Sequence, residues 1–176
     1  MNLQKLQKHI NRQTYDKNYQ DIEILDFIGY SKTHISWDNI SNLKIDWQRK
    51  TVCDVGCFHS YFGIKVFQAG ASKVYGLDNL PNVLETSKLI SKASNAEIEY
   101  LKWEGGEETP ECDIALILNV LHHCKDQHET LEKIKCSHVI FEVNTNQLPI
   151  ISKYFNPLAS EESHRDDRII VYAEKI

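Results

Sequence analysis

Short apolar runs alternate with segments of helical periodicity between residues 51 and 143, and this alternation limits the possible folds more than any other feature. Parallel strands joined by crossover helices produce this order, because two parallel strands cannot be linked by a tight turn. The run DIALILN at 113–119 has no polar alternation, as expected of a strand covered on both faces. We predict an α/β fold with a Rossmann-like, doubly wound, mainly parallel sheet of about seven strands.

The predicted elements follow one another in the order that such a sheet requires. Strands are predicted at 51–55, 73–78, 96–103, 113–119, 138–143 and 168–174, and helices at 61–69, 81–90, 129–135 and 148–155. Gly70 and Pro81 support two of these helix limits, because glycine commonly ends helices and proline commonly opens them. A further strand near 157–163 is close in sequence to the last one, so these two are expected to form an antiparallel hairpin at the sheet edge.

The first part of the chain has a different pattern and is expected to form an N-terminal helical cover. Apolar residues at helical spacing are Leu3, Leu6, Ile10, Ile24, Phe27 and Ile28. Ser36 is a plausible N-cap for the short helix that follows them. No linker or repeat divides the sequence, so we expect one domain over residues 1–176, with the cover at 1–47 and the Rossmann-like core at 48–176.

The composition argues against several classes of protein. No apolar run approaches the roughly 20 residues that a membrane-spanning helix needs, and the N-terminal residues are too polar for a signal peptide. The five cysteines are an odd number at scattered positions, which favours free thiols in a reducing compartment. We therefore expect a cytoplasmic protein with no membrane partner.

The charge is distributed unevenly along the chain. Residues 1–50 carry eight Lys or Arg and six Asp or Glu, whereas residues 51–176 carry twelve and nineteen. An acidic main body disfavours broad binding to nucleic acid, because phosphates are attracted by basic surfaces. A small-molecule substrate is therefore the expected partner. The alternatives are nucleic acid in the form of tRNA, which the charge disfavours, and a protein partner that completes the site.

The most informative residues follow the strand predicted at 51–55. In a sheet of this kind, ligands bind beyond the carboxyl ends of the strands. Gly56 lets the backbone approach a ligand closely, and the helix that starts after it offers free N–H groups to an anion. Asp78 ends the next strand, where a carboxylate can accept hydrogen bonds from both hydroxyls of a ribose. The spacing favours an adenosine-containing ligand but does not by itself distinguish between such ligands.

Three segments carry a resemblance to a known family. They are TVCDVGC at 51–57, AGASKVYGLDN at 69–79 and CDIALILNVLHHCKD at 112–126. Through them, residues 48–145 resemble the class I S-adenosylmethionine-dependent methyltransferases. The stretch YFGIKVFQAGASKVYGLDN at 61–79 is also similar to members that modify small polar substrates or the wobble uridine of tRNA. The resemblance implies S-adenosyl-L-methionine as the cofactor and transfer of its methyl group to an acceptor oxygen, nitrogen or carbon.

The same resemblance implies which residues form the site. The implied cofactor-binding residues are Asp54, Gly56, Cys57, Phe58, His59, Asp78, Asn79, Trp103, Glu104 and Asn119. Asp78 would hold the ribose, Trp103 would lie near the adenine, and Asn119 would face the methionine end of the donor. His122 and His123 would border the substrate pocket, and one of them is the candidate general base.

Two positions depart from the pattern of that family. Phe58 and Ser60 stand where the family usually has glycine. This departure supports an alternative in which the chain is a non-catalytic, methyltransferase-like module with a degenerate donor site. A nicotinamide-dependent oxidoreductase is a further alternative. It is disfavoured because GCFHSYFG lacks the G-x-G-x-x-G spacing that lets a pyrophosphate approach the backbone.

Several of these signals also have plain structural interpretations. Asp54 could cap the turn after its strand, and Asp78 could be an exposed loop carboxylate. Six residues invite a metal interpretation: Cys53, Cys57, His59, His122, His123 and Cys124. Their spacing matches no zinc module with two short ligand pairs, so no metal is expected, and strand alternation directs Cys53 into the core.

Two pairs of residues outside the resemblance also have both kinds of interpretation. His164 and Arg165 precede the last strand and could bind an anionic group on the substrate, or could belong to a solvated hairpin. Tyr15 and Tyr19 are four residues apart on the expected N-terminal helix and could close over the donor or serve in packing.

Overall fold

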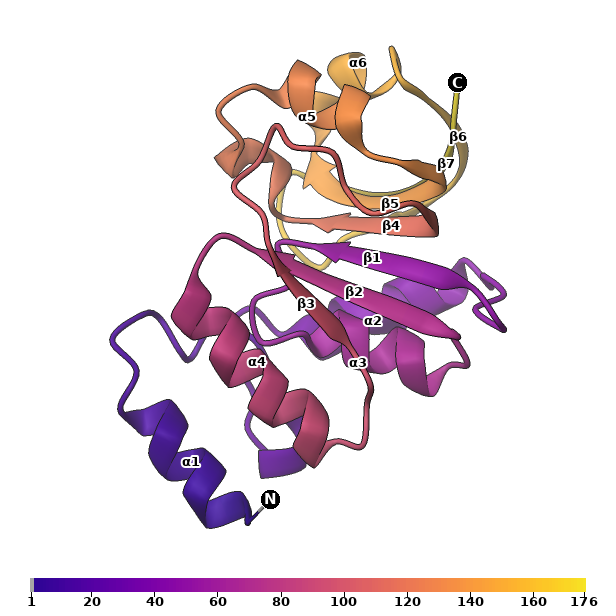
Figure 1. Cartoon of the computed structure of the whole chain (residues 1–176). Coiled ribbons are helices and arrows are strands. Elements are labelled where there is room, and N and C mark those ends of the chain that lie inside the picture. Colours follow the sequence, from indigo (N-terminus) through magenta and orange to yellow (C-terminus); the bar gives the residue numbers. More distant parts are fainter. Residues whose placement is uncertain (1) are drawn as a thin grey trace.

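The computed structural model describes residues 2–176, which form a mixed sheet with helices on both faces (Figure 1). The strands are β1 (Thr51–Val55), β2 (Lys73–Asp78), β3 (Glu99–Lys102), β4 (Cys112–Leu118), β5 (Cys136–Asn144), β6 (Phe155–Glu162) and β7 (Arg168–Lys175). Their order across the sheet is β3-β2-β1-β4-β5-β7-β6. The first five strands are parallel, and β7 pairs antiparallel with both β5 and β6. The predicted Rossmann-like sheet and its antiparallel edge hairpin are therefore confirmed.

The strand order reverses between β1 and β4. These strands are neighbours in the sheet, although β2 and β3 lie between them in the chain. Val52 of β1 is in register with Val74 of β2 on one side and with Ile114 of β4 on the other. In open α/β sheets the crevice for a ligand forms at the carboxyl ends of the strands at such a reversal.

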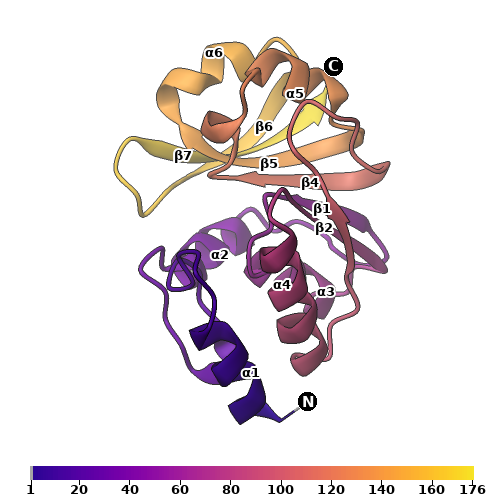
Figure 2. The same ribbon diagram turned by 60° about the vertical axis from the view of Figure 1, so that its left-hand side comes forward.

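Helices cover the sheet on both faces. They are α1 (Leu3–Asn11), α2 (Thr33–Asn42), α3 (Tyr61–Gln68), α4 (Pro81–Ala93), α5 (Gln127–Lys133) and α6 (Leu148–Ile151), with short 3₁₀ turns η1 (Glu23–Leu25), η2 (Leu121–His123) and η3 (Thr145–Gln147). Helices α2, α3 and α4 lie on one side of the sheet and α5 and α6 on the other (Figure 2). Among the helices of residues 2–176, none has the length and apolarity needed to cross a membrane.

Alternate residues of the central strands point into two separate cores. Val52 and Ile114 pack with Phe62 on the side of α2 and α3. Cys53 and its neighbour Ala115 are fully buried on the opposite side, in the cluster that includes residues of α5 and α6. This period of two is the geometry of a strand, and it confirms the expectation that Cys53 belongs to the core.

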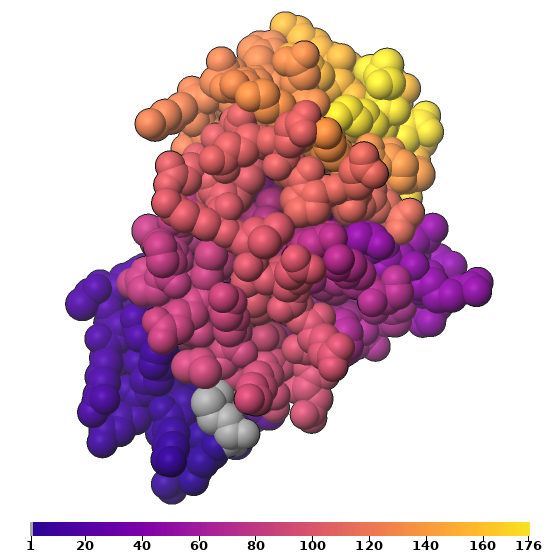
Figure 3. Space-filling model, viewed as in Figure 1, coloured from indigo at the N-terminus to yellow at the C-terminus, as the bar shows by residue number. Residues whose placement is uncertain are grey.

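The N-terminal segment packs against α4 rather than against the sheet. Leu6 and Ile10 of α1 are buried together with Ile22 and with Ile90 of α4. In the space-filling view the indigo N-terminal segment lies directly against the magenta part of the chain that includes α4 (Figure 3). Of the second apolar face expected from Ile24, Phe27 and Ile28, the first two residues pack against this cluster, but the helix is wrong. After the single turn η1 the chain reverses into a bridge between Ile22 and Phe27, and Ile28 is 69% exposed.

Three other predicted features are corrected by tertiary contacts. Ser36 is not an N-cap, because α2 already begins at Thr33, and Ser36 is buried within the helix. The helix predicted at 148–155 ends at Ile151, because Phe155 starts β6 and packs its ring against Phe141 of β5, with centroids 5.4 Å apart. The strand predicted at 96–103 is limited to Glu99–Lys102.

Leu116→Ala should lower the free energy of unfolding by about 2–5 kcal/mol, because Leu116 is fully buried in β4 at the centre of the sheet. Leu158→Ala, in edge strand β6, removes the same atoms from a side chain that is 50% exposed and should cost less than about 1 kcal/mol. Urea denaturation followed by circular dichroism measures both values. Equal losses in the two variants would contradict this layering of the sheet.

Candidate functional site

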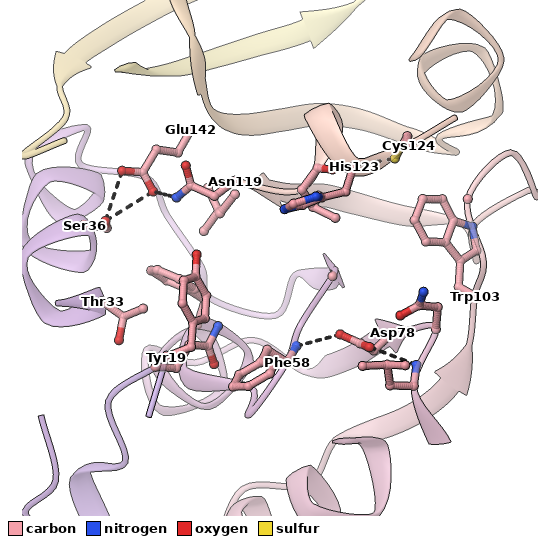
Figure 4. Close-up of a pocket in the computed structure, with 18 of the residues that line it drawn as sticks. Tyr19, Thr33, Ser36, Phe58, Asp78, Trp103, Asn119, His123, Cys124 and Glu142 are labelled. Atoms are coloured by element: carbon pink, nitrogen blue, oxygen red, sulfur yellow. Dashed lines mark hydrogen bonds between the residues drawn. The ribbon is translucent and has the colours of Figure 1, made fainter. Parts of the chain in front are cut away.

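A cavity of about 410 Å³ lies at the carboxyl ends of β1, β2 and β4, where the strand order reverses (Figure 4). Its volume falls in the range of small-molecule sites. Of the twelve site residues that the family resemblance implies, eight line it: Gly56, Phe58, Asp78, Asn79, Trp103, Glu104, Asn119 and His123. Four others do not line it: Asp54, Cys57, His59 and His122.

The turn after β1 has a backbone that only glycine adopts without strain at its first position. Gly56 has a φ of +72°, and a Cβ there would lie 2.6 Å from Cγ2 of Val120. The amides of Gly56 and Cys57 both donate to the carbonyl of Leu77 at 2.8 Å, which ties the turn to β2. The close approach of Gly56 to the segment after β4 shapes the floor of the cavity.

Phe58 and Ser60 hold left-handed backbone conformations, with φ of 48° and 62°. Such a conformation is costly for a bulky residue and has to be stabilised by its surroundings. The Phe58 ring packs edge-on against the rings of Tyr15 and Tyr19, at centroid distances of 5.6 and 5.5 Å, and lies 4.2 Å from the ring of His59. The aromatic packing therefore holds the ring of Phe58 in the cavity wall.

Asp78 ends β2 with its carboxylate at the cavity. Its Oδ2 accepts the N–H of Phe58 and its Oδ1 accepts the N–H of Leu80, both at 3.1 Å. Burial raises the pKa of Asp78, and these backbone hydrogen bonds oppose the rise. The alternative of an exposed loop carboxylate is wrong, since Asp78 is only 9% exposed. Each oxygen retains acceptor capacity toward the cavity.

Asp54 lies beneath the turn and is almost completely buried. Its Oδ2 accepts the N–H of Gly63 at 3.1 Å, in the first turns of α3. Burial raises the pKa of Asp54 to about 7, and the Gly63 hydrogen bond opposes the rise. The geometry is that of a support for the strand-to-helix turn, as the structural interpretation of this residue expected.

Cys57 and His59 also lie outside the cavity. The Sγ of Cys57 is buried near Gly76 of β2. His59 is buried with its Nε2 2.9 Å from the hydroxyl of Tyr15, and burial lowers its pKa to about 4. Alternation along the turn therefore sends these two side chains into the protein, whereas Phe58 between them reaches the cavity wall.

The two adjacent histidines of η2 differ in placement. Their rings are 4.0 Å apart, and both side chains are exposed, but only His123 lines the cavity. Burial lowers the pKa of His122, and the positive charges of His123, Arg168 and Arg165 lower it further. Basic groups from two distant parts of the chain therefore meet at this side of the cavity.

Glu142 was missed by the sequence analysis, although it occupies the opposite end of the cavity from Asp78 (Figure 4). It is fully buried at the carboxyl end of β5. Ser163 donates to its Oε1 at 2.6 Å, and Ser36 donates to both oxygens at 3.2 Å. The only signal in the sequence was a carboxylate inside the apolar run HVIFEV, where a charge is rarely buried without partners.

Asn119 links this carboxylate to an arginine. Its amide nitrogen donates to Glu142, and its amide oxygen accepts from Arg168. Its backbone is left-handed, with φ of 61°. The hydrogen bonds of the Asn119 side chain are therefore made within the protein. Its backbone N–H also donates to the carbonyl of Glu142, at 2.9 Å, so the main-chain carbonyl is the polar group left to meet a ligand.

Two segments that are distant in sequence complete the walls. Tyr19 and Thr33 line the cavity from the N-terminal part, and Arg165 lines it from the turn between β6 and β7. Tyr15 and Tyr19 do not lie on a helix, because α1 ends at Asn11 and both tyrosines follow it in an irregular segment. His164 does not line the cavity, and its Nε2 lies 3.1 Å from the carbonyl of Ser31.

Metal-ligating side chains are not gathered at this site. Within residues 2–176, no three His, Cys, Asp or Glu side chains are grouped so that they could hold a metal ion.

The central part of the chain is similar in sequence to known methyltransferases. Residues 53–136 match a family model described as a methyltransferase domain. A tRNA U34 carboxymethyltransferase from Shewanella frigidimarina (strain NCIMB 400) is 30% identical over 103 residues, which cover 56% of this chain and 31% of that protein. The chain therefore spans about a third of the length of this curated relative.

Solved structures share this fold. A SAM-dependent methyltransferase from Aquifex aeolicus has a TM-score of 0.68 and 13% identity, with 100% of both chains covered. Magnesium protoporphyrin IX methyltransferase from Synechocystis PCC 6803, solved with bound SAM, has a TM-score of 0.64 and 16% identity and covers 82% of this chain and 77% of its own. At these identities the likeness establishes the fold.

The raised pKa of Asp54 predicts a pH dependence of stability. Its pKa is about 7 in the folded protein and about 3.9 in an unfolded chain, so the folded state binds the extra proton between these values. The free energy of unfolding should therefore fall as the pH rises through this window, by at most about 1.4 kcal/mol per unit. Asp54→Asn removes the titration.

The stability of Asp54→Asn relative to the wild type should consequently rise by about 1 kcal/mol or more between pH 4 and pH 7. Urea denaturation at several pH values measures the difference. Asp38→Asn, which removes an exposed carboxyl group on α2, is the matched control measured in parallel. A flat difference for Asp54→Asn would contradict the raised pKa.

Proposed function

We propose that the chain transfers a methyl group from S-adenosylmethionine to a small acceptor, since residues 53–136 match a methyltransferase-domain family and the fold is like that of SAM-dependent methyltransferases of known structure. The observation that carries the proposal is the convergence of Gly56, Asp78 and Trp103 on one cavity. A close-approach turn, a carboxylate and an aromatic ring are the groups that recognise an adenosine with an attached amino acid.

The donor would lie along the ends of β2, β1 and β4. Asp78 would accept hydrogen bonds from the ribose hydroxyls, and Asn79, Trp103 and Glu104 would surround the adenine. Gly56 and the main chain of Asn119 would border the methionine end. In this proposal Asp54, Cys57 and His59 support the turn from its buried side and do not contact the donor, since none of them lines the cavity.

The protein's contribution to the chemistry is mainly positioning. S-adenosylmethionine supplies a methyl group that is already activated by its sulfonium sulfur. The cavity walls hold donor and acceptor in line, and the close walls exclude water. We propose that His123, rather than His122, faces the acceptor, because only His123 lines the cavity; it can take up the proton that an acceptor hydroxyl or amine releases.

A small acceptor fits the way the cavity is closed. Tyr19, Thr33 and Arg165 come from two segments that form walls opposite the donor residues, and both ligands share about 410 Å³. A nucleotide of tRNA is the second candidate, because the relative from Shewanella frigidimarina acts on tRNA. The net charge of −5 does not favour a broad contact with RNA. The N-terminal wall also supports treating residues 1–176 as one functional domain.

We favour an active methyltransferase over a non-catalytic module because the side chain of Phe58 does not fill the cavity. The ring packs against Tyr15 and Tyr19, and an open volume remains between Asp78 and Asn119. Because Phe58 and Ser60 replace glycines, the turn offers fewer backbone contacts to the methionine end of the donor. The proposed acceptor site beside the turn remains open.

Calorimetric titration of the purified protein with S-adenosylmethionine and S-adenosylhomocysteine tests the proposal. We expect both to bind, and Asp78→Ala to weaken binding at least tenfold, because hydrogen bonds to a charged group contribute about 1.5–3 kcal/mol. Asp38→Ala, an exposed aspartate on α2, should bind like the wild type. NAD serves as the second control.

The outcomes separate the alternatives. Absence of binding at millimolar ligand by a folded protein would favour the non-catalytic module. Tight binding of NAD alone would favour an oxidoreductase. An unchanged affinity in Asp78→Ala would show that the donor lies elsewhere.

A further inference from the structure

Arg165 brings a positive charge to the cavity wall from the turn between β6 and β7. Its Nη2 donates to the carbonyl of Ser31 at 3.2 Å and to the hydroxyl of Tyr19 at 3.4 Å. The guanidinium also lies 5.7 Å from the centroid of the Tyr19 ring. All of these partners are neutral, so they fix the position of the guanidinium without cancelling its charge.

No carboxylate in the described part of the chain neutralises this group by direct contact. The ion pairs within 4.0 Å among residues 2–176 include neither Arg165 nor Arg168. Asp166 and Asp167 follow Arg165 in the chain but are exposed. Arg168 faces the amide of Asn119, behind which the buried Glu142 balances its charge. Arg165 has no such counterpart.

A second basic side chain, His123, lines the same cavity as Arg165, and its ring lies 4.0 Å from that of His122. The pKa of His122 is lowered by burial and also by His123, Arg168 and Arg165, which favours its neutral form. The cavity wall therefore carries two basic side chains, although the chain as a whole carries a net charge of −5. An unpaired, fixed guanidinium in such surroundings is suited to a carboxylate or a phosphate.

The strand order shows which ligand meets this charge. Asp78, the proposed ribose residue, ends β2, whereas Arg165 precedes β7. These strands are four positions apart in the sheet, and the contacts that connect Arg165 to Asp78 run through Tyr19 and Phe58. The proposed donor path along the ends of β2, β1 and β4 stops short of β7, so the space beside Arg165 is left to the acceptor.

We propose that Arg165 anchors an acceptor subsite for a negatively charged group, so that the methyl acceptor is a small anionic molecule carrying a carboxylate or a phosphate. The proposal rests on the proposed methyltransferase function. It makes Arg165 a specificity residue that orients the acceptor toward the donor's methyl group.

The first test uses the complex with S-adenosylhomocysteine and two simple probes, inorganic phosphate and acetate. Backbone amide signals of residues 163–167 are followed by NMR during each titration, with sodium chloride at equal ionic strength as reference. We expect saturable shifts that identify the preferred anion, and at least tenfold weaker binding in Arg165→Gln. Arg165→Lys should retain part of the affinity, because it keeps the charge.

Arg12→Gln is the matched control, since Arg12 is exposed at the end of α1, away from the cavity. It should bind both probes like the wild type. Shifts confined to other surfaces, absence of binding by either probe, or equal binding by Arg165→Gln would overturn the subsite. The mapping of shifts on the wild type decides the matter even if Arg165→Gln does not fold.

The second test distinguishes the acceptor from the donor's own carboxylate. S-adenosylhomocysteine carries an amino acid, whereas 5′-methylthioadenosine lacks it. We expect Arg165→Gln to bind both with unchanged affinity. Weaker binding of S-adenosylhomocysteine alone would assign Arg165 to the donor and overturn the proposal. If the wild type binds neither, the proposed function itself fails and the acceptor assignment fails with it, whereas loss of the probe result alone removes only the subsite.

Discussion

A fully buried carboxylate, Glu142, is the constraint on which the shape of the cavity depends. An ionised group in the interior is tolerated only where hydrogen bonds replace the water that it has lost. Here the donors are Ser36 on α2, Asn119 after β4 and Ser163 after β6. The hydrogen bonds to this one carboxylate therefore connect helix α2, the centre of the sheet and the C-terminal hairpin at a common point beside the cavity.

The backbone at the same edge of the sheet is constrained in a second way. Gly56, Phe58, Ser60 and Asn119 all have positive φ, at the carboxyl ends of β1 and β4. Non-glycine residues hold such conformations only where their surroundings fix them. Phe58 is fixed by its aromatic neighbours and Asn119 by Glu142 and Arg168. The walls of the cavity are thus rigid, as positioning of two ligands requires.

The sequence was most informative where local pattern and tertiary structure agree. β1, β2 and β4 are apolar runs limited by polar residues, and Gly56 and Asp78 follow from their ends. The pattern failed where distant contacts decide the conformation. Phe155 leaves its predicted helix because Phe141 buries it, and Ser36 serves Glu142 rather than a helix end. Glu142 itself could not be foreseen, because its three donors come from segments that only the fold brings together.

The charges of the cavity are separated along its length, and this separation suits a reaction that changes the charge of the donor. Asp78 lies at one end, and the carboxylate of Glu142 lies at the opposite end. A sulfonium between them is attracted by both, whereas the neutral thioether that remains after transfer is not, so the same charges favour binding of donor over product. Arg165 lines the same cavity from the turn between β6 and β7, where in the proposed arrangement it attracts an anionic acceptor. The buried carboxylate of Glu142 shapes the wall, and its negative charge offsets the positive charges that the proposed reaction brings into one cavity.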